Sequence, residues 1–186
     1  PGQTHAEKLD HYFSLFDKLK EVGDKHGFKV FLGAEVCAVR ADGLYSEFML
    51  YGFDRSLLYD NPPLFHLTQK EMFEFAEKHG LFMYQTHPFR EGVAFGDPRY
   101  IHGAESFNGQ IYHINNNGSA EEFCKKYKLK MMSGSDYHDA GQPITGGIYI
   151  PENINTEKEL VDYLFGHQPK LIEDKTYIKK LKISGK

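Results

Sequence analysis

Residues 68–87 read TQKEMFEFAEKHGLFMYQTH. The first part of this stretch has residues typical of both ends of a helix, and the second part has residues typical of a strand. Thr68 is suited to the N-cap of a helix, and Glu71, three residues later, completes a capping box. Gly80 suits the position just after a helix, where the backbone turns left-handed. Leu81–Thr86 (LFMYQT) then predicts a strand, because apolar and aromatic residues dominate it. We therefore expect a helix that leads directly into a strand.

The same alternation continues on both sides of this stretch. Strands are expected at Phe28–Glu35, Glu47–Phe53, Gly103–Phe107, Lys130–Ser133 and Ile148–Ile150, with a hairpin turn at Asp42-Gly43 between the first two. Helices are expected around the apolar positions Leu9, Phe13, Phe16, Leu19 and Val22, from Ser119 to Tyr127 and at Thr156–Phe165. Strands alternating with helices of about ten residues predict an α/β fold built on a parallel sheet. In such folds the functional residues lie at the carboxyl ends of the strands.

The composition predicts one globular domain. The chain has 186 residues, 40% hydrophobic and 26% charged, with 22 Lys and Arg against 26 Asp and Glu, a net charge of −4. The negative charge argues against general nucleic-acid binding, which requires a positive field. No apolar run reaches the roughly 18 residues of a membrane-spanning helix. With only Cys37 and Cys124, a disulfide framework is excluded, so we expect a cytoplasmic protein.

Four potential metal ligands follow three of the predicted strands. Glu35 ends the segment VFLGAE, His87 follows FMYQT, and Asp136 and His138 follow MMSGS. Oxygen and nitrogen donors without thiolate suit zinc, manganese or iron in a hydrolytic site. Residues two apart in an extended segment point the same way, so Asp136 and His138 should face one partner while Tyr137 points elsewhere. A lone histidine is more often structural, but four such residues at three strand ends favour a metal site.

The motifs around these residues resemble one protein family. They are GAE ending at Glu35, THPFR at 86–90, GAESFNG at 103–109 and SGSDYH at 133–138, followed by a glycine-rich return to a strand at Gly146-Gly147-Ile148. In this order they resemble the polymerase-and-histidinol-phosphatase (PHP) family of metal-dependent phosphoesterases. The resemblance implies a distorted (β/α)7 TIM-like barrel with two or three divalent metal ions (Zn, Mn or Fe) inside its carboxyl rim. Glu35 resembles the family's bridging carboxylate, His87 the ligand of the His-Pro motif, and Asp136 and His138 the final ligand pair.

The chain departs from the family pattern at two places. The family's opening His-x-His strand and a later Asp-His motif would precede the first helix. We therefore expect a further strand–helix–strand of roughly 30–40 residues upstream, which makes residues 1–186 a single, N-terminally incomplete PHP-like domain whose barrel lacks its first strand or strands. Many members also carry a histidine on the strand after Glu35, where this sequence has Phe48 or Met49. The cluster would then hold fewer ions or use another ligand, such as Glu47.

Two further residues are candidates near the predicted metals. Arg90 lies three residues after His87, and its planar guanidinium could bind a substrate phosphate; a surface pairing with Glu91 is the alternative. We assign Arg90 and Asp136 as catalytic residues. Glu105, in the GAESFNG segment, is expected to orient the site rather than contact metal.

The predicted function is hydrolysis of a small phosphomonoester or phosphodiester by metal-activated water, with a small phosphorylated substrate and no membrane partner. Two alternatives stay open: a mononuclear metal amidohydrolase or deaminase on a similar barrel, and a catalytically reduced PHP scaffold domain. The sequence contains no GxxxxGK phosphate loop, no GxSxG nucleophile elbow and no GxGxxG after a strand.

Overall fold

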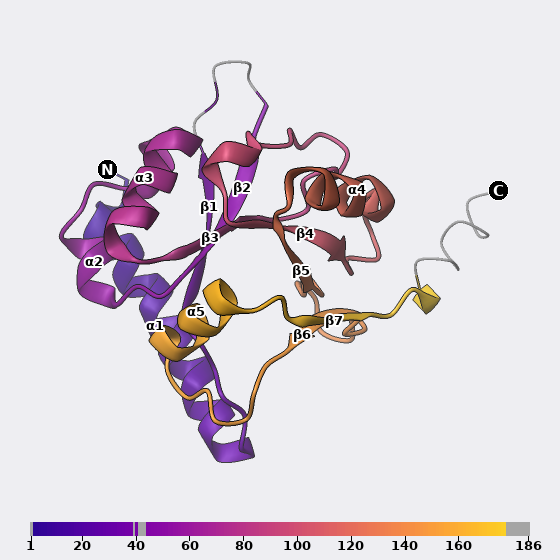
Figure 1. The fold of residues 1–186 in the computed structure, drawn as a ribbon. Coiled ribbons are helices and arrows are strands. Elements are labelled where there is room, and N and C mark those ends of the chain that lie inside the picture. Colours follow the sequence, from indigo (N-terminus) through magenta and orange to yellow (C-terminus); the bar gives the residue numbers. More distant parts are fainter. Residues whose placement is uncertain (1, 39, 41–43, 178–186) are drawn as a thin grey trace.

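A computed structural model describes residues 2–38, 40 and 44–177 (Figure 1). The predicted turn at Asp42-Gly43 and the end of the chain, 178–186, lie outside the described residues. The strands are β1 Gly33–Ala38, β2 Ser46–Tyr51, β3 Phe82–Gln85, β4 Gly103–Asn108, β5 Lys130–Gly134, β6 Gly146–Tyr149 and β7 Lys170–Glu173. The helices are α1 His5–His26, α2 Arg55–Tyr59, α3 Gln69–His79, α4 Asn117–Tyr127 and α5 Glu157–Gly166, with short 3-10 turns at Leu64–His66 and Pro98–Tyr100.

Five strands form one sheet in the order β1-β2-β3-β4-β5. The pairs β3–β4 and β4–β5 are parallel, whereas β1–β2 and β2–β3 are antiparallel. The predicted α/β class is therefore confirmed, and the antiparallel β1–β2 pair agrees with the predicted hairpin, but the prediction of a parallel sheet is wrong for the β2–β3 pair. As a result, the start of β2 lies at the same edge of the sheet as the carboxyl ends of β1 and β3.

The remaining strands, β6 and β7, form a separate antiparallel pair beside β5. Ser133 connects the two sheets: its Oγ donates to the Ile172 carbonyl at 2.7 Å and accepts from the Gly147 N–H at 3.1 Å. A side chain at Gly146 would place its Cβ 2.3 Å from the Gly134 carbonyl oxygen, so glycine permits this close approach. The described strands thus make an open sheet and a two-stranded one, and a closed barrel is not formed by them.

Alternate residues of β2 face two different cores. Phe48 and Leu50 are fully buried in the larger core, with side chains from α1, α2, α3 and α4. Met49 and Tyr51 face the other way and pack with Phe82 of β3 against the apolar side of α5, which lies in front of the strands in Figure 1. Because Glu35 pairs with Met49 in the β1–β2 register, Glu35 also belongs to the face of the sheet that α5 covers.

Helix α1 buries only part of its predicted apolar stripe. Leu9 and Phe13 are buried and Phe16 packs against the core, as the periodicity predicts. Leu19 and Val22 are 58% and 52% exposed, so the prediction is wrong for them. In Figure 1 the C-terminal part of α1 runs past the lower end of the sheet, where it has no strand to cover.

The helix ends follow their local sequence closely. Thr68 and Glu71 form the predicted capping box at α3, and Gly80 ends that helix with a φ of 66°. In contrast, α4 begins after Asn116, in a left-handed conformation, and not at Ser119 as predicted. The Asn116 side chain instead donates to the Phe89 carbonyl, which holds α4 against the loop after β3.

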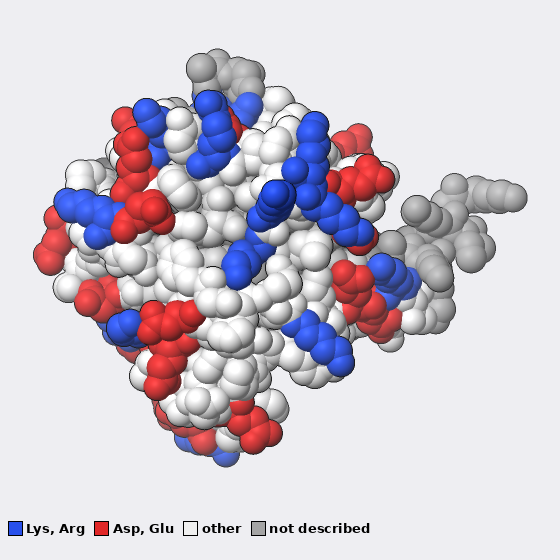
Figure 2. All heavy atoms as spheres, in the orientation of Figure 1, with Lys and Arg blue, Asp and Glu red and all other residues white. Residues whose placement is uncertain are grey.

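Opposite charges are interspersed on the surface drawn in Figure 2. Some form ion pairs one helical turn apart, such as Lys70 with Glu74 and Lys125 with Glu121. Such exposed pairs stabilise a helix only slightly. Within the described ranges, every helix is too short or too polar to traverse a lipid bilayer.

Candidate metal centre

The first two strands bring two carboxylates to one face of the sheet. Glu35 lies in β1 opposite Met49, and Glu47 lies in β2 opposite Cys37. Paired residues of antiparallel strands share a face, and so do residues two apart in one strand, so Glu35 and Glu47 are diagonal neighbours. Their side chains remain 38% and 29% exposed, which leaves both carboxylates accessible from solvent.

His87 comes from the third strand and is held in an unusual conformation. It lies two residues after the end of β3, its side chain is only 3% exposed, and its φ is 30°, in the region that favours glycine. Its backbone N–H donates to Oε2 of the buried Glu105 at 2.8 Å. This hydrogen bond fixes the turn that sends the imidazole back toward β1 and β2.

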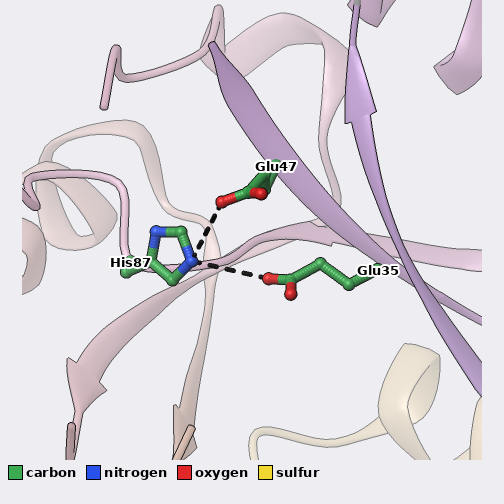
Figure 3. Close-up of side chains that lie close together, drawn as sticks. All are labelled: Glu35, Glu47 and His87. Atoms are coloured by element: carbon green, nitrogen blue, oxygen red, sulfur yellow. Dashed lines mark ion pairs between the residues drawn. The ribbon is translucent and has the colours of Figure 1, made fainter. Parts of the chain in front are cut away.

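The three side chains converge on one point (Figure 3). His87 Nε2 lies 3.3 Å from Glu47 Oε2 and 3.5 Å from Glu35 Oε1. One donor atom from each residue lies within 4.8 Å of the other two, a spacing that fits three ligands of a single cation. Figure 3 shows His87 Nδ1 on the far side of the ring; it is buried and has no hydrogen-bond partner among the described residues.

The two carboxylates have different electrostatic surroundings. The hydrogen bond from His87 holds the pKa of Glu35 below its usual value, against the effect of burial. Burial raises the pKa of Glu47, and the negative charge of Glu35 raises it further. Two adjacent carboxylates and one imidazole thus carry an excess of negative charge, which a divalent cation would neutralise.

A second group lies beside the first and contains Asp136. Its carboxylate forms an ion pair with Arg90, and each of these two side chains is 11% exposed. Arg90 also donates to Asn115 Oδ1 at 2.9 Å and to Asn108 Oδ1 at 3.1 Å. Burial alone would raise the pKa of Asp136, but the hydrogen bond and charge of Arg90 lower it. The negative charge of Asp136 opposes the lowering of the Glu35 pKa, but the hydrogen bond from His87 outweighs it.

Asp136 and His138 are arranged differently from the prediction. The segment is not extended, because Asp136 has a φ of 48°. His138 Nδ1 lies 3.2 Å from the Asp136 carboxylate and 3.0 Å from its backbone carbonyl, so the two residues contact each other. The His138 side chain is 63% exposed, and Tyr137 is 53% exposed.

Two buried glutamines support the unusual backbone of Asp136. Gln110 Nε2 donates to the Asp136 carbonyl at 2.9 Å, and Gln142 Nε2 donates to the same oxygen at 3.1 Å. Gln142 Oε1 in turn accepts the His138 N–H at 3.0 Å. These contacts replace the ladder hydrogen bonds that a strand would have supplied.

Glu105 and Asn108 connect the two groups. Asn108 Nδ2 donates to Glu105 Oε2 at 2.8 Å and to Asp136 Oδ2 at 3.3 Å. Burial raises the pKa of Glu105 to about 6, although the hydrogen bonds from Asn108 and from the His87 N–H oppose this. Glu105 therefore holds the backbone of His87, in line with the orienting role expected from the sequence.

The structure brings Glu35 and His87 together and places Asp136, His138 and Arg90 in the neighbouring group. Glu47, which the sequence suggested only as a substitute for the missing histidine, joins Glu35 and His87 as the third member of the candidate metal centre. The search for ligands past the carboxyl ends of strands did not find Glu47, because it stands at the start of an antiparallel strand. Arg90 pairs with Asp136 and not with Glu91.

Comparison with solved structures shows that the fold is shared. PsfC from Pseudomonas syringae matches with a TM-score of 0.60 at 16% identity, over 82% of this chain and 64% of that chain. A protein from Bifidobacterium adolescentis, proposed to be a metal-dependent phosphoesterase, matches with a TM-score of 0.51 at 13% identity, over 87% of this chain and 82% of its own. The chain thus spans less than two thirds of PsfC. No family model matches the sequence, and no curated protein does.

Proposed function

We propose that this chain is a metal-dependent phosphoesterase of the PHP type that hydrolyses a small phosphomonoester or phosphodiester. One observation carries the proposal: donor atoms of Glu35, Glu47 and His87 lie within 4.8 Å of one another. They do so at the sheet edge where α/β folds place their functional residues. The fold likeness to the Bifidobacterium protein supports the same class of reaction.

Each residue has a role in this proposal. Glu35, Glu47 and His87 hold a divalent cation, and Asp136 and His138 form the adjacent part of the cluster. When bound, such a cation lowers the pKa of a coordinated water and polarises a phosphoryl oxygen. Arg90 holds Asp136 in place and presents positive charge to the substrate phosphate.

The proposal extends to the whole domain. We take residues 1–186 as one PHP-like domain, with the open sheet as an arc of the (β/α)7 barrel that the resemblance implies. Its cofactors would be two or three divalent ions of zinc, manganese or iron, and its substrate a small phosphorylated molecule. Cys37 and Cys124 are both free thiols, which is typical of the reducing cytoplasm.

The test combines metal analysis with an activity panel. The purified chain, stripped with a chelator and reloaded with Mn²⁺ or Zn²⁺, should retain metal on gel filtration and hydrolyse p-nitrophenyl phosphate or bis-p-nitrophenyl phosphate. His87→Ala and Glu35→Gln should lose both metal and activity. His11→Ala, which changes an exposed histidine of α1, is the control and should keep both. Wild-type protein that retains no metal would overturn the proposal.

A second candidate is the catalytically reduced scaffold, which the Arg90–Asp136 pair favours. A guanidinium bound to a predicted metal ligand competes with a cation for the same oxygens. If the chain binds metal but hydrolyses neither phosphoester substrate, the scaffold is the better description. Turnover of an amide or an aminated base by the same loaded protein would instead favour the amidohydrolase alternative.

A further inference from the structure

Glu47 adds a second carboxylate to the metal centre, and the balance between oxygen and nitrogen donors affects which cation binds. The cluster consists of two carboxylates and one imidazole. Carboxylate oxygens are hard donors that suit Mg²⁺ and Mn²⁺, whereas imidazole and thiolate favour Zn²⁺. The donor set therefore has more oxygen than a histidine-rich zinc site.

Geometry alone does not decide between the two cations. A tetrahedral zinc with bonds of about 2.0–2.1 Å separates its ligands by about 3.3 Å. An octahedral ion with similar bonds separates adjacent ligands by about 3 Å. The observed separations from His87 Nε2, 3.3 Å to Glu47 and 3.5 Å to Glu35, permit either after a small adjustment. The chemistry of the donors must decide.

Among the described residues, the imidazole of His87 lacks a hydrogen bond that metal-binding histidines commonly make. A metal-binding histidine commonly donates its second N–H to a carboxylate or carbonyl, which fixes the ring and makes the coordinating nitrogen more basic. His87 Nδ1 is buried and has no such partner in the described part of the chain. Affinity at this centre must therefore come largely from Glu35 and Glu47.

One softer donor lies nearby: Cys37 is opposite Glu47 in the β1–β2 register, but its Sγ does not belong to the group of donor atoms that lie within 4.8 Å of one another. Met49, directly opposite Glu35 in the register, lies on the same face as both carboxylates and packs against the smaller core. Phe48 points into the larger core and is fully buried. Glu47 is thus the residue of β2 that supplies a ligand, and it supplies an oxygen.

We propose that Glu47 biases this centre toward a hard divalent cation of the Mn²⁺ type relative to Zn²⁺. This inference rests on the proposed metal-binding function and goes beyond it by naming the preferred cation. The nitrogen of His87 distinguishes Mn²⁺ from Mg²⁺, which binds mainly oxygen. The preference concerns the ratio of the two dissociation constants, since most sites bind Zn²⁺ more tightly than Mn²⁺ in absolute terms.

The experiment measures that ratio in the full chain. Free Mn²⁺ is followed by electron paramagnetic resonance during titration, and Zn²⁺ binding by competition with a chromophoric chelator. Glu47→His should weaken Mn²⁺ and preserve or strengthen Zn²⁺, so that Kd(Mn)/Kd(Zn) rises by at least about tenfold. Glu173→His is the matched control, because Glu173 also lies in a strand and its side chain has the same exposed fraction, 29%. The control should leave the ratio unchanged.

A second variant, Met49→His, tests the same inference in case Glu47→His does not fold. Met49→His adds an imidazole opposite Glu35 and keeps both carboxylates, so it should also raise the ratio. If Glu47→His does not fold, as judged by circular dichroism, Met49→His decides the question. A ratio equal to that of the wild type in the folded variants would overturn the inference while leaving the metal centre intact. Wild-type protein that binds neither cation would instead overturn the proposed function.

Discussion

Arg90 and Asp136 form an ion pair in which each side chain is 11% exposed, and both groups also hydrogen-bond to Asn108. The sequence predicted separate roles for these residues, a phosphate contact and a metal ligand. The structure joins them, so that a change at either residue must act on the other. Their coupling leads to the first prediction.

Arg90→Ala should destabilise the protein by about 1 to 3 kcal/mol, because it leaves the Asp136 carboxylate, whose side chain is 11% exposed, without its ionic partner. Urea unfolding at neutral pH measures the change. Lys158→Ala is the control: its partner Asp162 is 62% exposed, so the loss should stay below about 1 kcal/mol. Equal losses in both variants would show that the Arg90–Asp136 pair contributes no more than a surface pair.

The second prediction concerns the number of ions. Asp136→Ala and His138→Ala should each reduce the bound metal per chain, because these residues form the part of the cluster next to Glu35, Glu47 and His87. Inductively coupled plasma mass spectrometry after gel filtration measures the metal content. Unchanged metal content in both variants would remove Asp136 and His138 from the ligand set and leave a centre of three ligands.

Metal should also stabilise the fold. A cation present at about 100 times its Kd stabilises the native state by about 2.7 kcal/mol, and chelation removes this contribution. Differential scanning fluorimetry should therefore show a lower Tm for the wild type after a chelator is added. His87→Ala should melt at the same temperature with and without chelator. A chelator effect of wild-type size in His87→Ala would place the bound metal elsewhere.

Gly134 tests the support of His87 by Glu105. A Cβ at Gly134 would lie 2.5 Å from Glu105 Oε1, so Gly134→Ala should push the carboxylate away from the His87 N–H. We expect a loss of about 1 to 3 kcal/mol in urea unfolding and weaker metal binding. Gly118→Ala, in α4, is the control because a Cβ there meets nothing within 4 Å. Native metal affinity in Gly134→Ala would show that Glu105 does not position His87.

The capping box of α3 predicts a pH dependence of stability. Hydrogen bonds from the backbone and side chain of Thr68 lower the pKa of Glu71 from 4.5. A carboxyl with a lowered folded-state pKa stabilises the protein above its unfolded pKa, and this stability is lost as the pH falls through the folded value. Glu71→Gln keeps an acceptor oxygen but no charge, so its Tm should be below that of the wild type at neutral pH.

That difference between wild type and Glu71→Gln should vanish in acid. Thermal melts between neutral pH and pH values below the lowered pKa of Glu71 measure it. Glu91→Gln, which changes an exposed carboxylate outside any capping box, is the control and should follow the wild type throughout. A difference that persists when Glu71 is protonated would show that the charge of the carboxylate is not responsible.

The sequence predicted those features that depend on a few adjacent residues. The capping box of α3 and the left-handed glycine at Gly80 involve residues at most four positions from their partners. Glu35, expected at the end of the strand Phe28–Glu35, lies inside β1, but the position of His87 just past a strand followed from the same local signals. These predictions succeeded because the interactions that determine them form within one turn of helix or one strand end.

The sequence could not predict features that depend on distant partners. The antiparallel pairing of β2 with β3 joins residues more than thirty positions apart, such as Phe48 and Gln85, so the sequence did not show that Glu47 would lie beside His87. The left-handed backbone of Asp136 depends on Gln110, from a different loop. Leu19 has the periodicity of a buried residue, but the sheet does not extend far enough to cover it.

The number of residues between Ala38 and Ser46 sets the β1–β2 register, and this register decides which residue of β2 faces the metal centre. Side chains alternate between the two faces of a strand, so a slip of one position in this pairing would turn Glu47 toward the hydrophobic interior beside α3 and bring Phe48 to the ligand position. Single-residue insertions or deletions between Ala38 and Ser46 should therefore weaken metal binding.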